Sequence, residues 1–182
     1  MGYTTDFAGV FTLDEPLTEE QAAYLTKFCE TRRVKRDTSK LLDMEDQVRE
    51  AVGLPLGKEG EFFTGGLGLF GQGNDPSILD HNRPARTQPG LWCQWVPTED
   101  CSGIMWDGSE KFYNYVEWLE YIVQNFLIPW GRKLNGEVSW SGEDVEDVGV
   151  IVVKDNNIKV HYDAGLVKDN NTRVCPHCGA EL

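Results

Sequence analysis

The segment from Phe112 to Phe126 constrains the fold more than any other part of the chain. Its apolar residues recur at the spacing of one helix face. The four residues 107–110 stand before it with the spacing of a capping box, and Pro129 and Gly131 follow it as helix breakers. We therefore predict one long helix that buries an apolar stripe against another layer of structure. The stripe consists of Phe112, Val116, Leu119, Ile122, Val123 and Phe126.

A second helix and several strands can be placed around this helix. Thr18 and Gln21 have capping-box spacing, and Leu25, Phe28 and Cys29 follow on one face of the helix that they predict. The turn residues Asn156-Asn157 separate two apolar runs and predict a tight hairpin. Strands are predicted at residues 7–13, 91–96, 104–106, 137–140, 148–153 and 158–162.

The order of these elements predicts the fold class. Strand, helix, two strands, helix and further strands is the order of a ferredoxin-like α+β fold, in which two helices pack on one face of an antiparallel sheet. Residues 1–162 are expected to form this single domain. Within it, residues 37–90 are rich in Gly and Pro and predict a long, loop-rich insertion with a short helix near 41–52. Residues 163–182 form a C-terminal tail.

The chain is strongly acidic, with 30 acidic and 17 basic residues and a formal net charge of -13. Such a surface repels the phosphates of nucleic acids, so simple nucleic-acid binding is not expected. Solubility alone explains this charge, and mimicry of nucleic acid is the alternative. No apolar run reaches the roughly 18 to 20 residues of a membrane span, and no signal-peptide pattern is present. We expect a cytoplasmic protein without a membrane partner.

One late segment concentrates negative charge and is a candidate contact with a partner. Residues 137–147 contain no Lys or Arg. A row of carboxylates can occupy an arginine-lined groove built for phosphates, because both offer charged oxygens to guanidinium groups. A solvated hairpin is the alternative reading. The acids are Glu137, Glu143, Asp144, Glu146 and Asp147.

The dense basic cluster of the chain consists of Arg32, Arg33, Lys35 and Arg36. We expect it at the C-terminal end of the helix that Thr18 begins, where positive side chains are favoured by the helix dipole. It is also where a secondary contact with DNA or with an acidic partner would start.

The cysteines suggest one possible metal site. Five cysteines are scattered along the chain, an odd number that favours reduced thiols over a disulfide framework. Cys175 and Cys178 flank Pro176 and His177 and form half of a zinc knuckle. A second copy of the chain could complete a four-cysteine site in a homodimer. A zinc ribbon that has lost its partner, or a reactive tail, would have the same sequence.

No complete catalytic signature is present, so we do not expect an enzyme. Neither a Gly-x-Ser-x-Gly elbow nor a His-Glu-x-x-His pair occurs. Cys93 and Cys101 are the candidate nucleophiles if the chain is a small thiol enzyme. The Gly-rich run from Gly65 to Gly71 resembles a phosphate-binding loop only faintly, because no Lys-Ser/Thr pair follows it.

Three stretches of the chain resemble a known family. They are Gly2-Tyr3-Thr4-Thr5-Asp6-Phe7, residues 91–100 (LWCQWVPTED) and residues 111–119 (KFYNYVEWL). They are similar to a widespread family of small proteins carried by phages and mobile elements. Within that family, the length of this chain and its terminal tail resemble those of metagenome-derived type II-A anti-CRISPR proteins, which inhibit the nuclease Cas9. The resemblance spans most of residues 1–162.

The resemblance implies a protein that acts in a bacterial host cell. It would bind Cas9, with or without guide RNA, and stop the cleavage of target DNA without an enzymatic step of its own. Two other hypotheses remain open from the residues. One is a phage protein that sequesters signalling nucleotides through residues 65–86, and the other is the small thiol enzyme.

Overall fold

The computed structural model describes residues 2–65, 73 and 75–162 and contains a bent, seven-stranded sheet. The strand order is β5-β6-β2-β7-β8-β9, with β1 also paired to β7, and every pairing is antiparallel. The strands are β1 (Thr5–Gly9), β2 (Phe11–Leu13), β5 (Trp95–Pro97), β6 (Gly103–Trp106), β7 (Leu134–Gly142), β8 (Val148–Lys154) and β9 (Asn157–Tyr162).

Four α-helices and a smaller sheet complete the described residues. The helices are α1 (Glu19–Glu30), α2 (Thr38–Leu41), α3 (Gln47–Ala51) and α4 (Tyr115–Ile122), and α4 continues directly into a π-helix, η1 (Val123–Leu127). β3 (Val34–Arg36) and β4 (Ile78–Pro84) form a separate antiparallel pair. None of the helices in these described ranges is long and apolar enough to cross a membrane.

The predicted mixture of helices with an antiparallel sheet is confirmed, but the ferredoxin-like strand order is not. β7, β8 and β9 pair in succession as hairpins, and β1 and β2 both pair with β7. A ferredoxin-like sheet instead interleaves strands from two strand-helix-strand units.

The sheet bends where β1 gives way to β2. Both strands pair with the single long strand β7, and the register continues from Gly9 opposite Val138 to Thr12 opposite Asn135. Gly9 has a φ of 122°, and a Cβ there would lie 2.6 Å from the carbonyl oxygen of Glu137. Only glycine fits this close approach, and the bend lets β2 pair with β6 on its other side.

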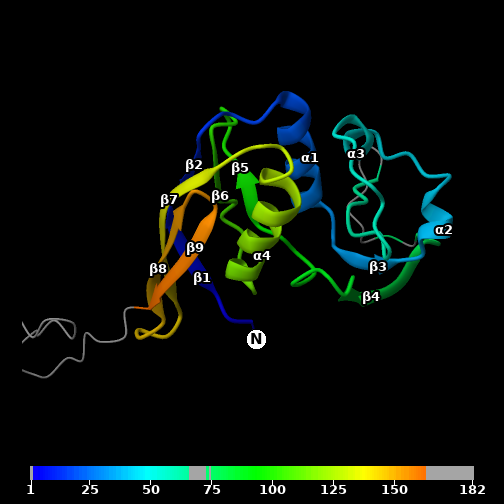
Figure 1. Ribbon diagram of the computed structural model, residues 1–182. Coiled ribbons are helices and arrows are strands. Elements are labelled where there is room, and N and C mark those ends of the chain that lie inside the picture. The colour runs from blue at the N-terminus through cyan, green and yellow to red at the C-terminus, as the bar shows by residue number, and fades with distance from the viewer. Residues whose placement is uncertain (1, 66–72, 74, 163–182) are drawn as a thin grey trace, which may run out of the picture.

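The core lies between one face of the sheet and the helices α1 and α4 (Figure 1). Alternation along β7 decides which face is covered, because Val138 and Trp140 are buried while Glu137 and Ser139 are exposed. Aromatic rings fill much of the interior, and the Phe28 ring meets those of Trp118 and Phe126 edge to face.

Residues 34–86, here called the inserted lobe, leave the sheet between α1 and β5. Figure 1 shows α2, α3, β3 and β4 on the far side of α1 from the sheet. Two chain segments join this lobe to the body, and they meet where the Arg33 amide donates to the Leu91 carbonyl at 2.8 Å. The predicted insertion therefore contains a small sheet of its own, and its regular structure begins at Val34 rather than after Asp37.

Several predicted boundaries change in the structure. The capping box of Thr18 and Gln21 is confirmed, but α1 ends at Glu30. The helix predicted from residues 107–110 onward begins only at Tyr115, because Lys111 and Asn114 adopt left-handed backbone angles. Phe112 is still buried, from the loop before α4.

The last hairpin turns one residue earlier than predicted. Its two turn residues with positive φ are Asp155 and Asn156, and Lys154 pairs with Asn157. Such a pair of left-handed residues is the geometry of a type I′ turn, which Asn and Asp tolerate.

Candidate functional site

The acidic segment forms the loop between β7 and β8, and two of its carboxylates hold that loop in place. Asp147 accepts hydrogen bonds from the Tyr3 hydroxyl at 2.7 Å and from the Trp140 indole at 3.1 Å. Glu143 accepts the Thr4 amide at 2.8 Å. These bonds fix the loop to the N-terminal segment, so Glu143 and Asp147 have a structural role.

The three residues between them, Asp144, Val145 and Glu146, form the hairpin tip and face solvent. Val145 is 89% exposed. Among the described residues no hydrogen bond or ion pair engages the side chain of Asp144 or Glu146. The tip therefore presents one apolar side chain between two unpaired carboxylates on an anchored loop.

Glu137 does not join the other four acids. It lies further along β7, opposite Val152, on the exposed face of the sheet. Lys159 on β9 follows Val152 in the same row, so a positive charge shares this part of the face. The structure thus places four of the five predicted acids in one loop and Glu137 outside it.

The basic cluster is not a surface patch, which corrects the prediction for Arg33 and Arg36. They are 1% and 2% exposed. Arg36 Nη1 lies 2.5 Å from an Asp75 carboxylate oxygen and 2.6 Å from Ser77 Oγ. Arg33 donates to the Phe63 carbonyl. The segment enters β3 instead of ending α1. Arg36 points into the lobe, and Arg33 lies between the Phe28 ring of α1 and the Phe63 carbonyl.

Arg33 has an unusual environment for a charged group. Its guanidinium carbon lies 4.3 Å from the centre of the Phe28 ring, and its Nε and Nη1 atoms have no partner among the described residues. Burial lowers the pKa of Arg33, because an unpaired charge is poorly solvated in the interior. Arg32 is only partly exposed.

Lys35 belongs to an ion-pair network within the inserted lobe. Its ammonium group and the Arg86 guanidinium each lie 2.9 Å from the same Glu59 oxygen. The Arg86 amide donates to the other Glu59 oxygen at 2.8 Å. The amide of Arg86, followed by Lys35, lowers the pKa of Glu59 to about 2. Sequence reasoning missed this network because its members lie far apart in the chain.

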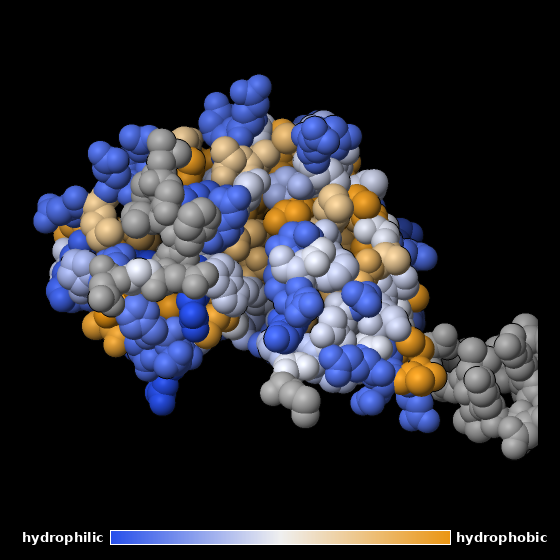
Figure 2. Space-filling view, turned by 180° about the vertical axis from the view of Figure 1, so that it is seen from behind, coloured by the Kyte–Doolittle hydropathy of each residue, from blue (hydrophilic) through white to orange (hydrophobic). Residues whose placement is uncertain are grey.

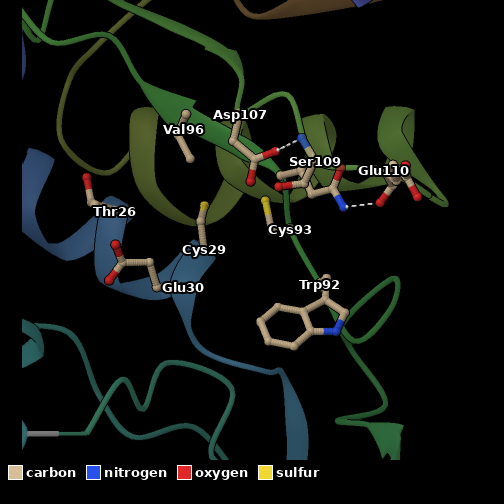
Figure 3. Close-up of a pocket in the computed structure, with 10 residues that line it drawn as sticks. Thr26, Cys29, Glu30, Trp92, Cys93, Val96, Asp107, Ser109 and Glu110 are labelled. Atoms are coloured by element: carbon tan, nitrogen blue, oxygen red, sulfur yellow. Dashed lines mark hydrogen bonds between the residues drawn. The ribbon is translucent and has the colours of Figure 1, made fainter. Parts of the chain in front are cut away.

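A pocket of about 470 Å³ opens beside the C-terminal turn of α1 (Figure 3). Cys29 and Cys93 line it, and the Cys29 thiol donates to the Trp95 carbonyl at 3.0 Å. The Cys93 thiol, and then burial, raise the pKa of Cys29 well above its ordinary value. Cys29 is therefore a neutral thiol at pH 7. The lining residues are Thr26, Cys29, Glu30, Trp92, Cys93, Gln94, Val96, Asp107, Ser109 and Glu110.

The sequence patterns did not reveal this pocket. Cys29 fits the apolar stripe of α1, and Cys93 lies 64 residues further along the chain, in the segment before β5. Cys101, the other candidate nucleophile, is partly exposed in the turn between β5 and β6, with a φ of 61°.

The predicted zinc site cannot be placed. Cys175 and Cys178 lie outside the described residues, as does most of the run from Gly65 to Gly71. In the part of the chain that is described, no group of three or more His, Cys, Asp or Glu residues could hold a metal ion. Zinc binding therefore stays a prediction.

The face shown in Figure 2 is covered mainly by hydrophilic residues, and apolar side chains appear between them in smaller patches. Recognition through this face would therefore depend on polar and charged contacts.

Comparison with known proteins adds no relative. No family model, no curated protein and no solved structure matches the chain.

Proposed function

We propose that this protein is a non-catalytic inhibitor that binds the Cas9 nuclease, with or without guide RNA, in the cytoplasm of a bacterial host. Binding blocks the cleavage of target DNA. The proposal begins from the resemblance of most of residues 1–162 to a family of phage proteins, and of the chain's length and terminal tail to anti-CRISPR proteins within that family. The hairpin tip is the structural observation that supports it most.

The tip is suited to a basic partner. Asp144 and Glu146 are free to accept hydrogen bonds, and residues 134–153 contain no Lys or Arg that would neutralise them. Bidentate pairing with guanidinium groups is the strong form of such contacts. Val145 adds an apolar contact between the two carboxylates.

Cas9 supplies a surface of the required kind. It holds nucleic acid in positively charged channels and reads its recognition motif with arginines. Carboxylates on an anchored loop can take the place of phosphates there, and the net charge of -13 accelerates the encounter.

The proposal differs from the sequence prediction in one respect. A DNA contact through residues 32–36 is no longer included, because Arg33 and Arg36 are buried. Rapid turnover by a reactive thiolate is not part of the proposal, since the raised pKa of Cys29 keeps its thiol neutral at pH 7.

A cleavage assay with purified Cas9, guide RNA and target DNA tests the proposal. Excess protein should abolish cleavage, and the protein should co-purify with Cas9. Full cleavage at a saturating concentration of the protein would refute the inhibitor hypothesis. Calorimetry with cyclic nucleotides tests the alternative hypothesis. Tight nucleotide binding by a protein that does not inhibit Cas9 would favour the nucleotide-sequestering function.

Zinc binding by Cys175 and Cys178, within one chain or shared by a homodimer, is a separate part of the proposal. Zinc per chain should fall when both residues are changed to Ser, and a dimer held by the metal should dissociate on chelation. Native protein purified without metal would contradict this part alone.

A further inference from the structure

Cys29 and Cys93 lie at the base of the inserted lobe. Cys29 is in the last turn of α1, just before the chain enters the lobe, and Cys93 follows Leu91 on the way back. The backbone bond from Arg33 to Leu91 joins the two crossing segments immediately beyond the cysteines. The two thiols therefore lie where the lobe meets the body.

The sulfur atoms share one neighbour. Cys29 Sγ is 3.0 Å and Cys93 Sγ is 4.0 Å from the carbonyl oxygen of Trp95. Figure 3 shows both sulfurs side by side at the pocket, below the Asp107 carboxylate. A side-chain hydrogen bond also joins Cys29 to Cys93, so the two sulfurs are direct neighbours, as disulfide formation requires.

Both thiols line the pocket, and Cys29 is the more exposed of the two, at 6% against 1% for Cys93. Cys29 is therefore the thiol that a small molecule in the pocket would meet, and the charge of the pocket favours one class of molecule. Glu30, Asp107 and Glu110 contribute carboxylates, while no Lys, Arg or His of the described residues lines the pocket. One Asp107 oxygen accepts the Ser109 amide at 2.7 Å, which fixes the carboxylate above the sulfurs. Trp92 adds an aromatic wall that favours a cation.

We propose that Cys29 and Cys93 form a thiol–disulfide exchange site that takes a small, positively charged disulfide through this acid-lined pocket. The site goes beyond the proposed inhibition of Cas9 and does not depend on it.

The exchange proceeds in two displacements. The Cys29 thiolate attacks one sulfur of the small disulfide, forms a mixed disulfide and releases the first thiolate. Cys93, after losing its proton, attacks Cys29 Sγ and releases the second. The protein loses two electrons and two protons, and the small disulfide becomes two thiols.

The environment makes the reaction slow at neutral pH. The raised pKa of Cys29 keeps the thiolate fraction low at pH 7, so the rate should rise with pH. The bond would join the two ends of the inserted lobe covalently.

Mass spectrometry of the folded protein tests the proposal. The parent for this experiment carries Cys101→Ser, Cys175→Ser and Cys178→Ser, so that Cys29 and Cys93 are its remaining thiols. It is incubated with cystamine, a dication, or with dithiodipropionate, a dianion, at about pH 8.5. After an acid quench, trypsin should release peptide 28–32 linked to peptide 87–111 by a disulfide.

The comparison of the two reagents tests the route through the pocket. Cystamine should form the link roughly tenfold faster than dithiodipropionate, and added salt should shrink that ratio. Asp107→Asn should reduce the ratio, whereas the matched Glu99→Gln, outside the pocket, should leave it unchanged.

Three results would overturn the proposal. They are equal rates for the two reagents, a mixed disulfide that never closes, and a link that forms only after denaturant is added. The wild-type protein is the control for the three Cys→Ser changes. Its linked peptide 87–111 contains both Cys93 and Cys101, and fragmentation of that peptide should assign the disulfide to Cys93.

Discussion

Arg33 and Arg36 belong to one short basic segment, but only Arg36 is paired with a carboxylate. Arg36 faces Asp75 and Ser77 and packs over the Phe63 ring, 4.7 Å from its centre. Arg33 has no carboxylate partner in the described structure and keeps one carbonyl bond. Sequence alone gives both residues the same charge, so the difference depends on which acid the fold places beside each.

Replacing each arginine by methionine should separate these situations. Arg36→Met should lower the free energy of unfolding by about 3 kcal/mol, because it leaves the Asp75 carboxylate unpaired. Arg33→Met should change it by no more than about 1 kcal/mol, since the lost carbonyl bond is offset by removal of a poorly solvated charge. Urea unfolding measures both values, and equal losses would contradict this account.

Gly149 makes a steric prediction at the same scale. A Cβ there would lie 2.2 Å from the Trp140 ring, which crosses β8 to reach Tyr162. Gly149→Ala should therefore destabilise the protein by about 2 to 3 kcal/mol. Gly90→Ala is the control, because its Cβ would meet no atom closer than 3.5 Å. Similar unfolding midpoints for both variants would show that the ring can move away.

The elements differ in how far the sequence predicts them. The capping box of α1 and the hairpins were predictable, because each is specified by a few neighbouring residues. The start of α4 was not predictable from the sequence. Residues 107–110 have the spacing of a capping box, but in the structure they form a turn in which Asp107 accepts a hydrogen bond from the Ser109 amide. The pairing of β3 with β4 joins residues that lie 42 to 50 positions apart in the chain, from Arg36 with Ile78 to Val34 with Pro84, and no local pattern specifies it.

The inserted lobe should be sensitive to acid through Glu59. Its pKa falls from 4.5 to about 2 in the folded protein, so its ion pairs stabilise the fold above pH 4.5. That contribution is lost as the pH falls toward 2. Glu59→Gln should therefore reduce the slope of the free energy of unfolding against pH between pH 4.5 and about pH 2.

A pH series of urea unfolding measures this effect. Glu45→Gln removes one exposed carboxylate from the same lobe and should keep the wild-type slope. An unchanged slope in Glu59→Gln would mean that the network around Glu59 does not couple to folding.

At the scale of the whole molecule, the protein is an acidic body whose basic residues are partly buried in their own ion pairs. The acidic loop was predictable from composition, because five acids without a basic residue stand close together. Which of these acids anchor the loop and which remain unpaired at its tip was not predictable. Only the fold places Tyr3, Thr4 and Trp140 where they hold Asp147 and Glu143 and leave the tip free.

The central claim is that the hairpin tip binds Cas9, and its affinity for the Cas9–guide RNA complex tests this most directly. The test variant combines Asp144→Asn, Val145→Ser and Glu146→Gln and leaves the anchoring acids unchanged. The control combines Glu137→Gln with Glu99→Gln, which removes the same charge elsewhere.

We predict that the tip variant binds at least about tenfold more weakly than wild type and loses part of its salt dependence. The control should stay within about twofold of wild type, because rim charges outside the contact contribute little. Wild-type affinity in the tip variant, or an equal loss in the control, would contradict the claim.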